Sequence, residues 1–320
     1  MLSTTTGSYV AKDLGYNLGM SFSSKIKVAV IRGGLSSQYD TSLKTGEYIL
    51  STLREMPETY EPIDILISKN GEWHREGLVE KPHQTLDLAD VAWNALHGPF
   101  GEDGQIGRLF EGLQLPFTGS SPVASVLSMN KDMARRLYKR HLLLTPAHEV
   151  ITKDNLNEDY LIAIFRNYLH PVIIKPANTS RSLGVALAYT FSELKEKIEE
   201  TLDRSSRVLV EEFISGDEVS CLVIEGARDE KIYALIPVSK SKLKTEQSKE
   251  IERIAKLAHE ALGLRHYSSS DFIITPNKKI YILESNSLPA LHEGSSMHES
   301  LLSTGWRPRD FVNHVLRLAM

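Results

Sequence analysis

A short valine-rich run that ends close to two glycines places the strongest constraint on the fold. Residues 27–31 read KVAVI, and Gly33 and Gly34 follow almost directly. Apolar residues then recur at helical spacing over 42–53. A strand, a glycine turn and a helix in this order open an α/β unit, so the sequence predicts that the fold begins with one.

The rest of the chain changes from this pattern to a strand-rich one. Further helices are predicted over 105–113, 122–129, 132–140, 190–204 and 247–262, and from Pro308 onward. Further strands are predicted over 61–67, 91–96, 147–151, 171–177, 184–189, 208–212, 218–225, 231–238, 271–275 and 280–285. The predicted order is an α/β unit, a small α+β block and a larger antiparallel α+β block.

Composition limits the classes of function. A chain of 320 residues has room for two or three domains of about 100–200 residues each. Its net charge of −4 gives no basic field to hold nucleic acid or an anionic membrane. The single cysteine, Cys221, excludes an internal disulfide and a cysteine-based metal cage. We therefore expect a cytoplasmic protein without nucleic-acid or membrane partners. Residues 1–24 are expected to form a flexible tail, with a functional arm as the alternative.

Two acids and an amide on neighbouring predicted strands form a candidate metal site. One tight turn joins the strands of Asp271 and Glu284, and Asn286 follows Glu284 by two residues on the same face of the sheet. Mg²⁺ prefers such oxygen ligands together with phosphate oxygens. The alternative is an exposed hairpin whose acids are solvated, and the pattern alone does not separate the two.

Several polar groups are candidates for nucleotide binding. Lys175 lies in an apolar predicted strand, where its ammonium needs an anionic partner; a nucleotide phosphate and a structural salt bridge both satisfy this. The loop 178–184 supplies hydroxyls and a glycine that could cover a phosphate. Backbone edges near 208–214 could bind an adenine and Glu218 a ribose, or this is an edge strand with solvated acids. His97 opens the densest polar loop, where a structural histidine is the alternative to a functional one.

Seven segments, taken in order, resemble the D-alanine–D-alanine ligase family of the ATP-grasp superfamily over about 25–318. They are RGGLSSQYDTSLKTG, NALHGPFGEDGQIGRLFE, LPFTGSSPVASVLSMNKDMARRLY, VIIKPANTSRSLGV, VLVEEFISGDEVS, SSSDFII and LESNSLPALHEGSS. The resemblance implies an ATP-grasp fold, α/β and α+β, in which an N-terminal parallel α/β domain precedes two α+β domains that sandwich ATP. The implied domains are 25–124, 125–207 and 208–320.

The resemblance also implies a reaction. ATP would phosphorylate the carboxylate of a first D-alanine, and the amine of a second would attack the acylphosphate to form a dipeptide for peptidoglycan synthesis. The implied cofactors are ATP and Mg²⁺, with Mn²⁺ as an alternative. The implied partners are small-molecule amino acids, and a homodimer follows by family analogy.

Site residues follow from positions that match the family's motifs. Nucleotide binding is implied for Lys131, Lys175, Glu211, Glu212, Phe213, Ile214, Glu218, Ile273 and Leu283. Metal binding is implied for Asp271, Glu284 and Asn286, and substrate binding for Gln38, His97, Ser295 and Ser296. The catalytic positions are Arg181, Ser182 and Ser269.

The chain departs from the family pattern mainly around the amino acids. Gln38 stands where the family has a Glu that orients the first substrate, and Ser269 stands where it has an Arg that stabilises the oxyanion. Losing one such donor typically costs about 10²–10³ in rate. Ala290 replaces a usual glycine, and the phosphate-covering loop reads Ser-Arg-Ser over 180–182 instead of Gly-Ser-Ser. Arg181 would restore anion stabilisation if it points inward.

The family's long lid loop, with its Lys and Tyr, is also missing. Val238 continues through SKSKLKTEQSK almost directly into the next predicted helix. Lys240, Lys242 and Lys244 either reach a phosphate or form a solvated charge run. Three hypotheses remain: a D-alanine–D-alanine ligase, a ligase of changed amino-acid specificity, and a nucleotide-binding protein without ligase turnover.

Overall fold

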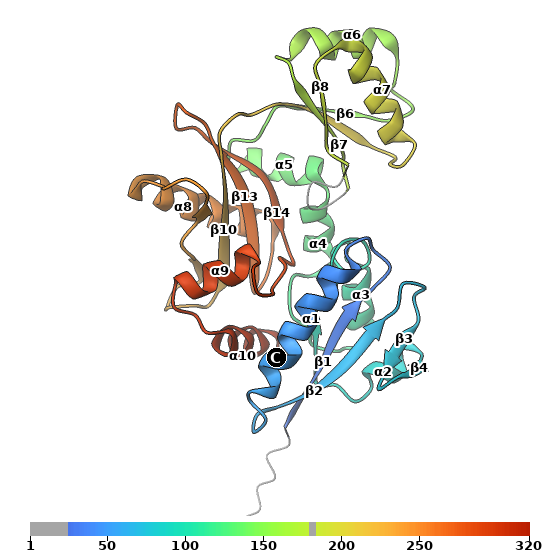
Figure 1. Cartoon of the computed structure of the whole chain (residues 1–320), viewed down its shortest axis with the longest axis vertical. Coiled ribbons are helices and arrows are strands. Elements are labelled where there is room, and N and C mark those ends of the chain that lie inside the picture. Colours follow the sequence, from blue (N-terminus) through green and yellow to red (C-terminus); the bar gives the residue numbers. More distant parts are fainter. Residues whose placement is uncertain (1–24, 179–183) are drawn as a thin grey trace, which may run out of the picture.

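The computed structural model describes residues 25–178 and 184–320, and three sheets follow one another along this part of the chain (Figure 1). The N-terminal sheet has the order β4-β3-β2-β1-β5, and β1 pairs in parallel with β2 and β5. Its elements are β1 (Ile26–Gly33), α1 (Tyr39–Arg54), β2 (Tyr60–Ile67), β3 (Trp73–Arg75), β4 (Leu78–Glu80), α2 (Pro82–Leu86), β5 (Val91–Asn94) and α3 (Gln105–Gly112). The predicted α/β opening is therefore confirmed.

Gly33 shows why a glycine is needed where β1 turns towards α1. Its φ is +89°, in the left-handed region, and a Cβ at this position would collide with the carbonyl oxygen of Ile67 on β2. The adjacent backbone N–H of Gly34 donates to that same carbonyl at 2.8 Å. A side chain at position 33 would therefore disrupt the turn that directs α1 across the sheet.

The central sheet has the order β6-β9-β7-β8, and α6 and α7 pack on it. Its elements are β6 (His148–Ile151), α6 (Glu158–Asn167), β7 (Val172–Pro176), β8 (Ala186–Ala188), α7 (Phe191–Leu202) and β9 (Val208–Glu212). The predicted hairpin of β7 and β8 is confirmed. β9 lies beyond the expected domain boundary at 207, yet it pairs with β6 and β7, so the central sheet extends to Glu212.

The C-terminal sheet has the order β11-β10-β13-β14, with β12 also paired to β10. Its strands are β10 (Asp217–Glu225), β11 (Ile232–Ala234), β12 (Val238–Ser239), β13 (Tyr267–Ile274) and β14 (Ile280–Asn286). The prediction of one strand over 231–238 is wrong. β11 and β12 pair with different parts of β10, and Pro237, which has no N–H to donate, lies between them.

Five helices accompany the C-terminal sheet: α4 (Pro122–Met129), α5 (Lys131–Arg140), α8 (Thr245–Leu262), α9 (Ser296–Ser303) and α10 (Pro308–Ala319). α4, α5 and α8 share one hydrophobic core with it. α10 instead packs with α1 and β5 in a core that also includes residues of β10, which joins the N-terminal and C-terminal parts of the chain (Figure 1).

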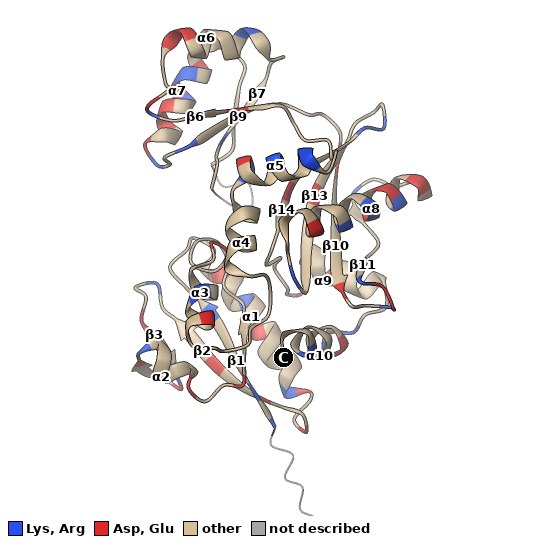
Figure 2. Ribbon diagram, turned by 180° about the vertical axis from the view of Figure 1, so that it is seen from behind, with Lys and Arg blue, Asp and Glu red and all other residues tan. Residues whose placement is uncertain are grey.

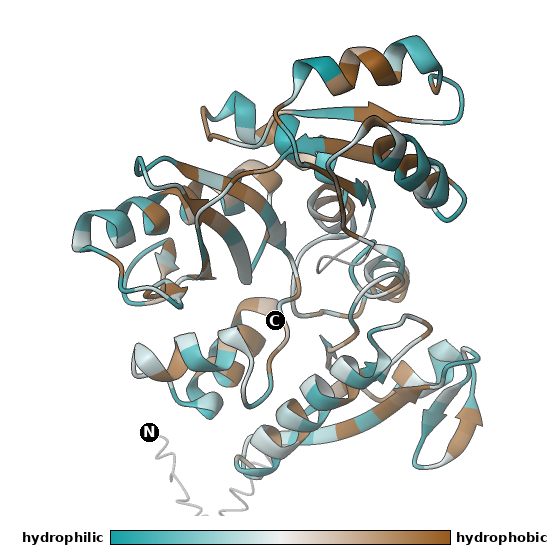
Figure 3. Cartoon of the chain, turned by 45° about the horizontal axis from the view of Figure 1, so that its top comes forward, coloured by the Kyte–Doolittle hydropathy of each residue, from teal (hydrophilic) through white to brown (hydrophobic). Residues whose placement is uncertain are grey.

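Hydrophobic, hydrophilic and charged residues are distributed along the elements as follows. Hydrophobic residues run along the strands and on parts of the helices, with hydrophilic residues interspersed (Figure 3). α6, α7 and α8 each carry both signs of charge (Figure 2). Within 25–178 and 184–320, no helix is long and apolar enough to cross a membrane.

Candidate active site

A row of side chains crosses the C-terminal sheet and forms the floor of the candidate site. Val238 on β12 pairs with Ser220 on β10, Ser220 pairs with Asp271 on β13, and Asp271 pairs with Glu284 on β14. Asn286 follows Glu284 by two residues, which places it on the same face. The structure thus brings the three predicted metal ligands onto adjacent strands and one face.

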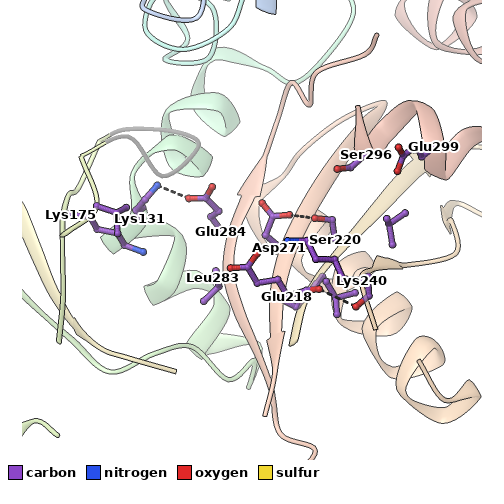
Figure 4. Close-up of a pocket in the computed structure, with 15 residues that line it drawn as sticks. Lys131, Lys175, Glu218, Ser220, Lys240, Asp271, Leu283, Glu284, Ser296 and Glu299 are labelled. Atoms are coloured by element: carbon purple, nitrogen blue, oxygen red, sulfur yellow. Dashed lines mark hydrogen bonds and ion pairs between the residues drawn. The ribbon is translucent and has the colours of Figure 1, made fainter. Parts of the chain in front are cut away.

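A cavity of about 520 Å³ lies over this row (Figure 4). We call it the nucleotide cavity, after the ligand that the sequence analysis predicts for Lys131, Lys175 and Glu218. Lys131 enters it from the start of α5, and Lys175 enters it from β7 of the central sheet. Residues that line it include Lys131, Lys175, Glu218, Ser220, Val238, Lys240, Asp271, Leu283, Glu284, Ser296 and Glu299. Elements of two sheets and of α5 therefore converge on one space, and both lysines predicted for phosphate binding lie in it.

Ion pairs hold the two lysines in place. Lys131 Nζ lies 2.7 Å from Glu284 Oε2, and Lys175 Nζ lies 2.6 Å from Glu211 Oε1. Arg135 also pairs with Glu211. Burial alone would raise the pKa of Glu211, but Arg135 and Lys175 outweigh it and hold the pKa below its ordinary value. Lys175 is thus a structural ion-pair partner that also lines the cavity, and its role in phosphate binding stays a prediction.

Asp271 differs from Glu284 in its electrostatic environment. Burial raises the pKa of Asp271 to about 6, against the hydrogen bond that Ser220 Oγ donates to its Oδ1 at 2.5 Å. The charges of Glu284 and Glu218 raise it further. For Glu284, burial acts in the same direction, but Lys131 outweighs it and the pKa is lowered. A cation beside Asp271 would therefore relieve an unfavourable buried charge.

A second cavity of about 340 Å³ adjoins the first. We call it the acceptor cavity, after the amino-acid substrate that the sequence analysis predicts at Ser295 and Ser296. Ser220, Val238, Asp271 and Ser296 line both. The acceptor cavity is also lined by Ser269, Asn286, Ala290, His292, Ser295 and Ser300. Five of the predicted site residues therefore meet here: Ser269, Asp271, Asn286, Ser295 and Ser296.

Ser295 has a defined structural role at this cavity. It is the N-cap of α9, where its Oγ accepts hydrogen bonds from the backbone N–H groups of His292 and His298, both at 3.2 Å. These bonds fix the loop before α9, and the helix start faces the acceptor cavity through Ser295 and Ser296.

Gln38 and His97 lie in the N-terminal part and do not line either cavity. Both are buried. His97 Nε2 lies 2.8 Å from Thr45 Oγ1, and its Nδ1 lies 3.5 Å from Glu102 Oε1. Thr45 Oγ1 also accepts from the backbone N–H of Leu291 at 3.3 Å. His97 is therefore connected through Thr45 to the segment that borders the acceptor cavity.

The remaining predicted residues lie apart from the nucleotide cavity or outside the described residues. Glu212 and Phe213 line a separate cavity of about 460 Å³, and Glu212 Oε1 accepts from Ala147 N–H at 2.8 Å. Ile214 and Ile273 do not line the nucleotide cavity either. Arg181 and Ser182 lie outside the described residues.

Ser220 and Arg135 are among the residues of this site that sequence reasoning missed. Ser220 is two residues beyond Glu218, so the alternation of a strand places both on one face, and this signal could have identified it. Arg135 is four residues after Lys131 on α5, which places the two on one side of the helix. Its complete burial has no local sequence signal, because it depends on Glu211 from another sheet.

Comparison with known proteins agrees with this geometry. The family described as D-ala D-ala ligase C-terminus matches residues 137–242 and 234–317, together more than half of the chain. The D-alanine–D-alanine ligase of Geotalea uraniireducens is 30% identical over 313 residues, which cover 92% of this chain and 95% of that protein.

Solved structures of similar proteins share the fold. The VanG D-Ala:D-Ser ligase of Enterococcus faecalis has a TM-score of 0.82 at 23% identity and covers 92% of this chain and 100% of its own. The D-alanine–D-alanine ligase of Bacillus anthracis, solved in complex with ATP, has a TM-score of 0.77 at 25% identity and covers 92% and 96%. The predicted α/β and α+β fold of the ATP-grasp type is confirmed. The chain belongs to the D-alanine–D-alanine ligase family.

Proposed function

We propose that this chain is an ATP-dependent carboxylate–amine ligase that joins two D-alanine molecules through an acylphosphate, a step of peptidoglycan precursor synthesis. The junction of the two cavities is the observation that carries this proposal. Because Ser220, Val238, Asp271 and Ser296 line both spaces, the terminal phosphate of a nucleotide in the first would lie at the edge of the second. Family membership supplies the type of reaction.

The residues of the nucleotide cavity fit ATP with a divalent cation, which we infer to be Mg²⁺. Among the described residues, no group of three His, Cys, Asp or Glu side chains could hold a metal by itself. Asp271, Glu284 and Asn286 instead offer two carboxylates and one amide, the incomplete set that Mg²⁺ completes with phosphate oxygens and water. The raised pKa of Asp271 supports this assignment because a cation there would stabilise the carboxylate.

Different residues of the nucleotide cavity would bind different parts of ATP. Phosphate oxygens can replace Glu284 and Glu211 as partners of Lys131 and Lys175, so the two ammonium groups would hold the polyphosphate. Glu218 lies in the same cavity and would bind the ribose hydroxyls. The bound cation would withdraw charge from the transferred phosphate.

The second substrate would bind in the acceptor cavity. We propose that Ser295 and the backbone N–H groups at the start of α9 hold its carboxylate, because a helix N-terminus favours an anion. Gln38 and His97 would orient the first amino acid from the N-terminal side. Ser269 would donate one hydrogen bond to the oxyanion where the family has an Arg, a weaker interaction than one from a charged group.

Purified protein with ATP, Mg²⁺ and D-alanine tests the proposal. We expect phosphate and ADP to appear only when D-alanine is present, together with a D-alanyl-D-alanine product detected by mass spectrometry. A Lys175→Met variant serves as the inactive control. Binding of Mg·ATP without dipeptide at any concentration of D-alanine would reject the D-alanine–D-alanine ligase and leave a nucleotide-binding protein or a ligase of changed specificity.

A ligase of changed specificity is a second candidate, and the lining of the acceptor cavity favours it. Ser269, His292, Ser296 and Ser300 give this space more hydrogen-bonding groups than an alanine methyl needs. The similar VanG protein acts on D-serine as well as D-alanine by its name. A panel of D-amino acids scored by ADP formation separates the candidates, since preference for a hydroxylated acceptor over D-alanine would replace the first assignment.

A further inference from the structure

Lys240 stands at the junction of the two cavities. It follows β12 (Val238–Ser239) directly, and Val238 pairs with Ser220 on the floor of the site. Val238, Ser239 and Lys240 all line the nucleotide cavity, so the end of this strand and the residue after it border the site. Lys240 lines the nucleotide cavity, and Figure 4 shows its side chain extending towards Asp271 and Glu218.

The ammonium of Lys240 differs from those of the other two lysines of this cavity in its ion-pair partners. Lys131 and Lys175 are paired with Glu284 and Glu211. Within 25–178 and 184–320, Lys240 has no carboxylate within ion-pair distance, although Asp271 and Glu218 line the same cavity. An ammonium that faces a ligand cavity without a fixed partner can bind an anionic ligand without first breaking a buried pair.

The position of Lys240 identifies the part of the nucleotide that it would meet. Figure 4 shows Glu284 and Asp271 between Lys240 on one side and the two other lysines, Lys131 and Lys175, on the other. Val238, two residues before Lys240, lines both cavities. In the proposed reaction the bond from phosphorus to the ADP oxygen breaks and a bond to the substrate carboxylate oxygen forms, so the phosphoryl group passes from the space that holds the nucleotide towards the space that holds the amino acid, which is this junction.

We propose that the ammonium of Lys240 binds the terminal phosphate of ATP. A residue of the short connection between β12 and α8 would then supply the cation that the family's longer lid loop carries. The proposal rests on the proposed ligase function for the identity of the nucleotide. Lys240 forms no covalent bond in the reaction; its ammonium stabilises charge on the phosphate oxygens as they transfer. The connection 240–244 is short because α8 begins at Thr245, so Lys240 cannot move far from the cavity.

The neighbouring Lys242 offers a matched control. It lies in the same connection, is exposed, and does not line the nucleotide cavity. A solvated charge run would give Lys240 and Lys242 equal and small effects. A phosphate contact would affect Lys240 alone and would depend on the terminal phosphate.

Calorimetric titration of the full chain with Mg·ATP and with Mg·ADP tests the proposal. We expect Lys240→Ala to weaken Mg·ATP binding about tenfold, the loss of one charged contact, and to change Mg·ADP binding less than about twofold. Lys240→Arg should recover most of the ATP affinity, and Lys242→Ala should leave both affinities unchanged. Equal losses for ATP and ADP, or equal effects of the two alanine variants, would overturn the assignment.

The binding measurement also separates this proposal from the ligase proposal. If the wild-type chain binds Mg·ATP but forms no dipeptide, the ligase assignment fails and the ATP-to-ADP comparison still decides the role of Lys240. If dipeptide forms and Lys240→Ala binds ATP as the wild type does, only the role of Lys240 fails. If the wild type binds no Mg·ATP, both are rejected.

Discussion

The nucleotide cavity and the acceptor cavity share a wall but hold their charges differently. On the nucleotide side, Lys131 and Lys175 are fixed by buried carboxylates before any ligand contacts them. On the acceptor side, Ser269 occupies the place of an expected arginine, and hydroxyls such as Ser295 and Ser300 line the space. Charged groups held in place bind strongly and specifically, whereas hydroxyls give weaker and more adaptable contacts. Nucleotide binding and ligation can therefore be lost separately in this chain.

The largest expected effect is on the nucleotide side. Lys175→Met removes a charge that binds phosphate and leaves Glu211 with Arg135 as its only cation among its described partners. We expect Mg·ATP affinity to fall by about 10²–10³, since truncating one partner of a buried charge pair costs roughly 2–5 kcal/mol. Calorimetry measures the loss, and Lys153→Met, which removes an exposed lysine, is the control. Unchanged ATP affinity in Lys175→Met would contradict the comparison.

Asp271 lines both cavities, and Asp271→Asn should increase the stability of the protein while it removes its activity. Burial raises the pKa of Asp271 from 3.8 to about 6 in the folded chain. The folded protein therefore binds this proton more tightly than the unfolded chain does, and stability falls as pH rises from about 4 to about 6. Without nucleotide or metal, Asp271→Asn should raise the free energy of unfolding at pH 7 by about 2 kcal/mol and abolish turnover.

Denaturant unfolding of Asp271→Asn and the wild type at pH 7 and pH 4 checks this. Most of the gain should disappear at pH 4, where the wild-type carboxyl is protonated in the folded state and about half ionised in the unfolded chain. A variant that is less stable than the wild type at pH 7, or equally stabilised at both pH values, would show that Asp271 is not an uncompensated buried charge.

Some of this site could be predicted from local sequence, and some could not. The spacing of Asp271, Glu284 and Asn286 fixes their shared face because strand alternation and one tight turn leave little freedom. The membership of β9 in the central sheet could not be predicted, since pairing between distant strands has no local signal. The hairpin of β3 and β4 was missed because each strand has three residues and Leu78 and Val79 are exposed, so no alternation is visible.

Ser269→Arg tests whether the acceptor side is limited by its neutral donors. A guanidinium at this position would face the acceptor cavity and could stabilise the oxyanion. We expect kcat for dipeptide formation to rise about tenfold, less than the 10²–10³ that such a donor supplies in a site built around it. ATP affinity should not change. Steady-state kinetics with D-alanine measures the effect, and Ser269→Lys provides a charged control without the planar donor group.

A smaller effect is expected where the N-terminal part contacts the acceptor side. The hydroxyl of Tyr48 on α1 forms a hydrogen bond of 2.9 Å with His298 Nδ1, and the two rings meet edge to face. His298 is in the first turn of α9, and its backbone N–H donates to Ser295 Oγ. Tyr48→Phe keeps the ring contact and removes only this hydrogen bond, so the free energy of unfolding should fall by about 1 kcal/mol.

Tyr48→Phe should change the KM for the substrate of the acceptor cavity and leave the KM for ATP unchanged. The hydrogen bond fixes α9, whose start borders the acceptor cavity, whereas Lys131 and Lys175 are held by Glu284 on β14 and Glu211 on β9. We expect KM for the second amino acid to rise about two- to threefold while KM for ATP stays constant, because a lost neutral hydrogen bond costs about 1 kcal/mol or less when only positioning is affected. Lys44→Ala, at an exposed position of the same helix, is the control. A parallel rise in both KM values would mean that the two cavities respond as one unit, and the separation between a fixed nucleotide side and an adaptable acceptor side would not hold.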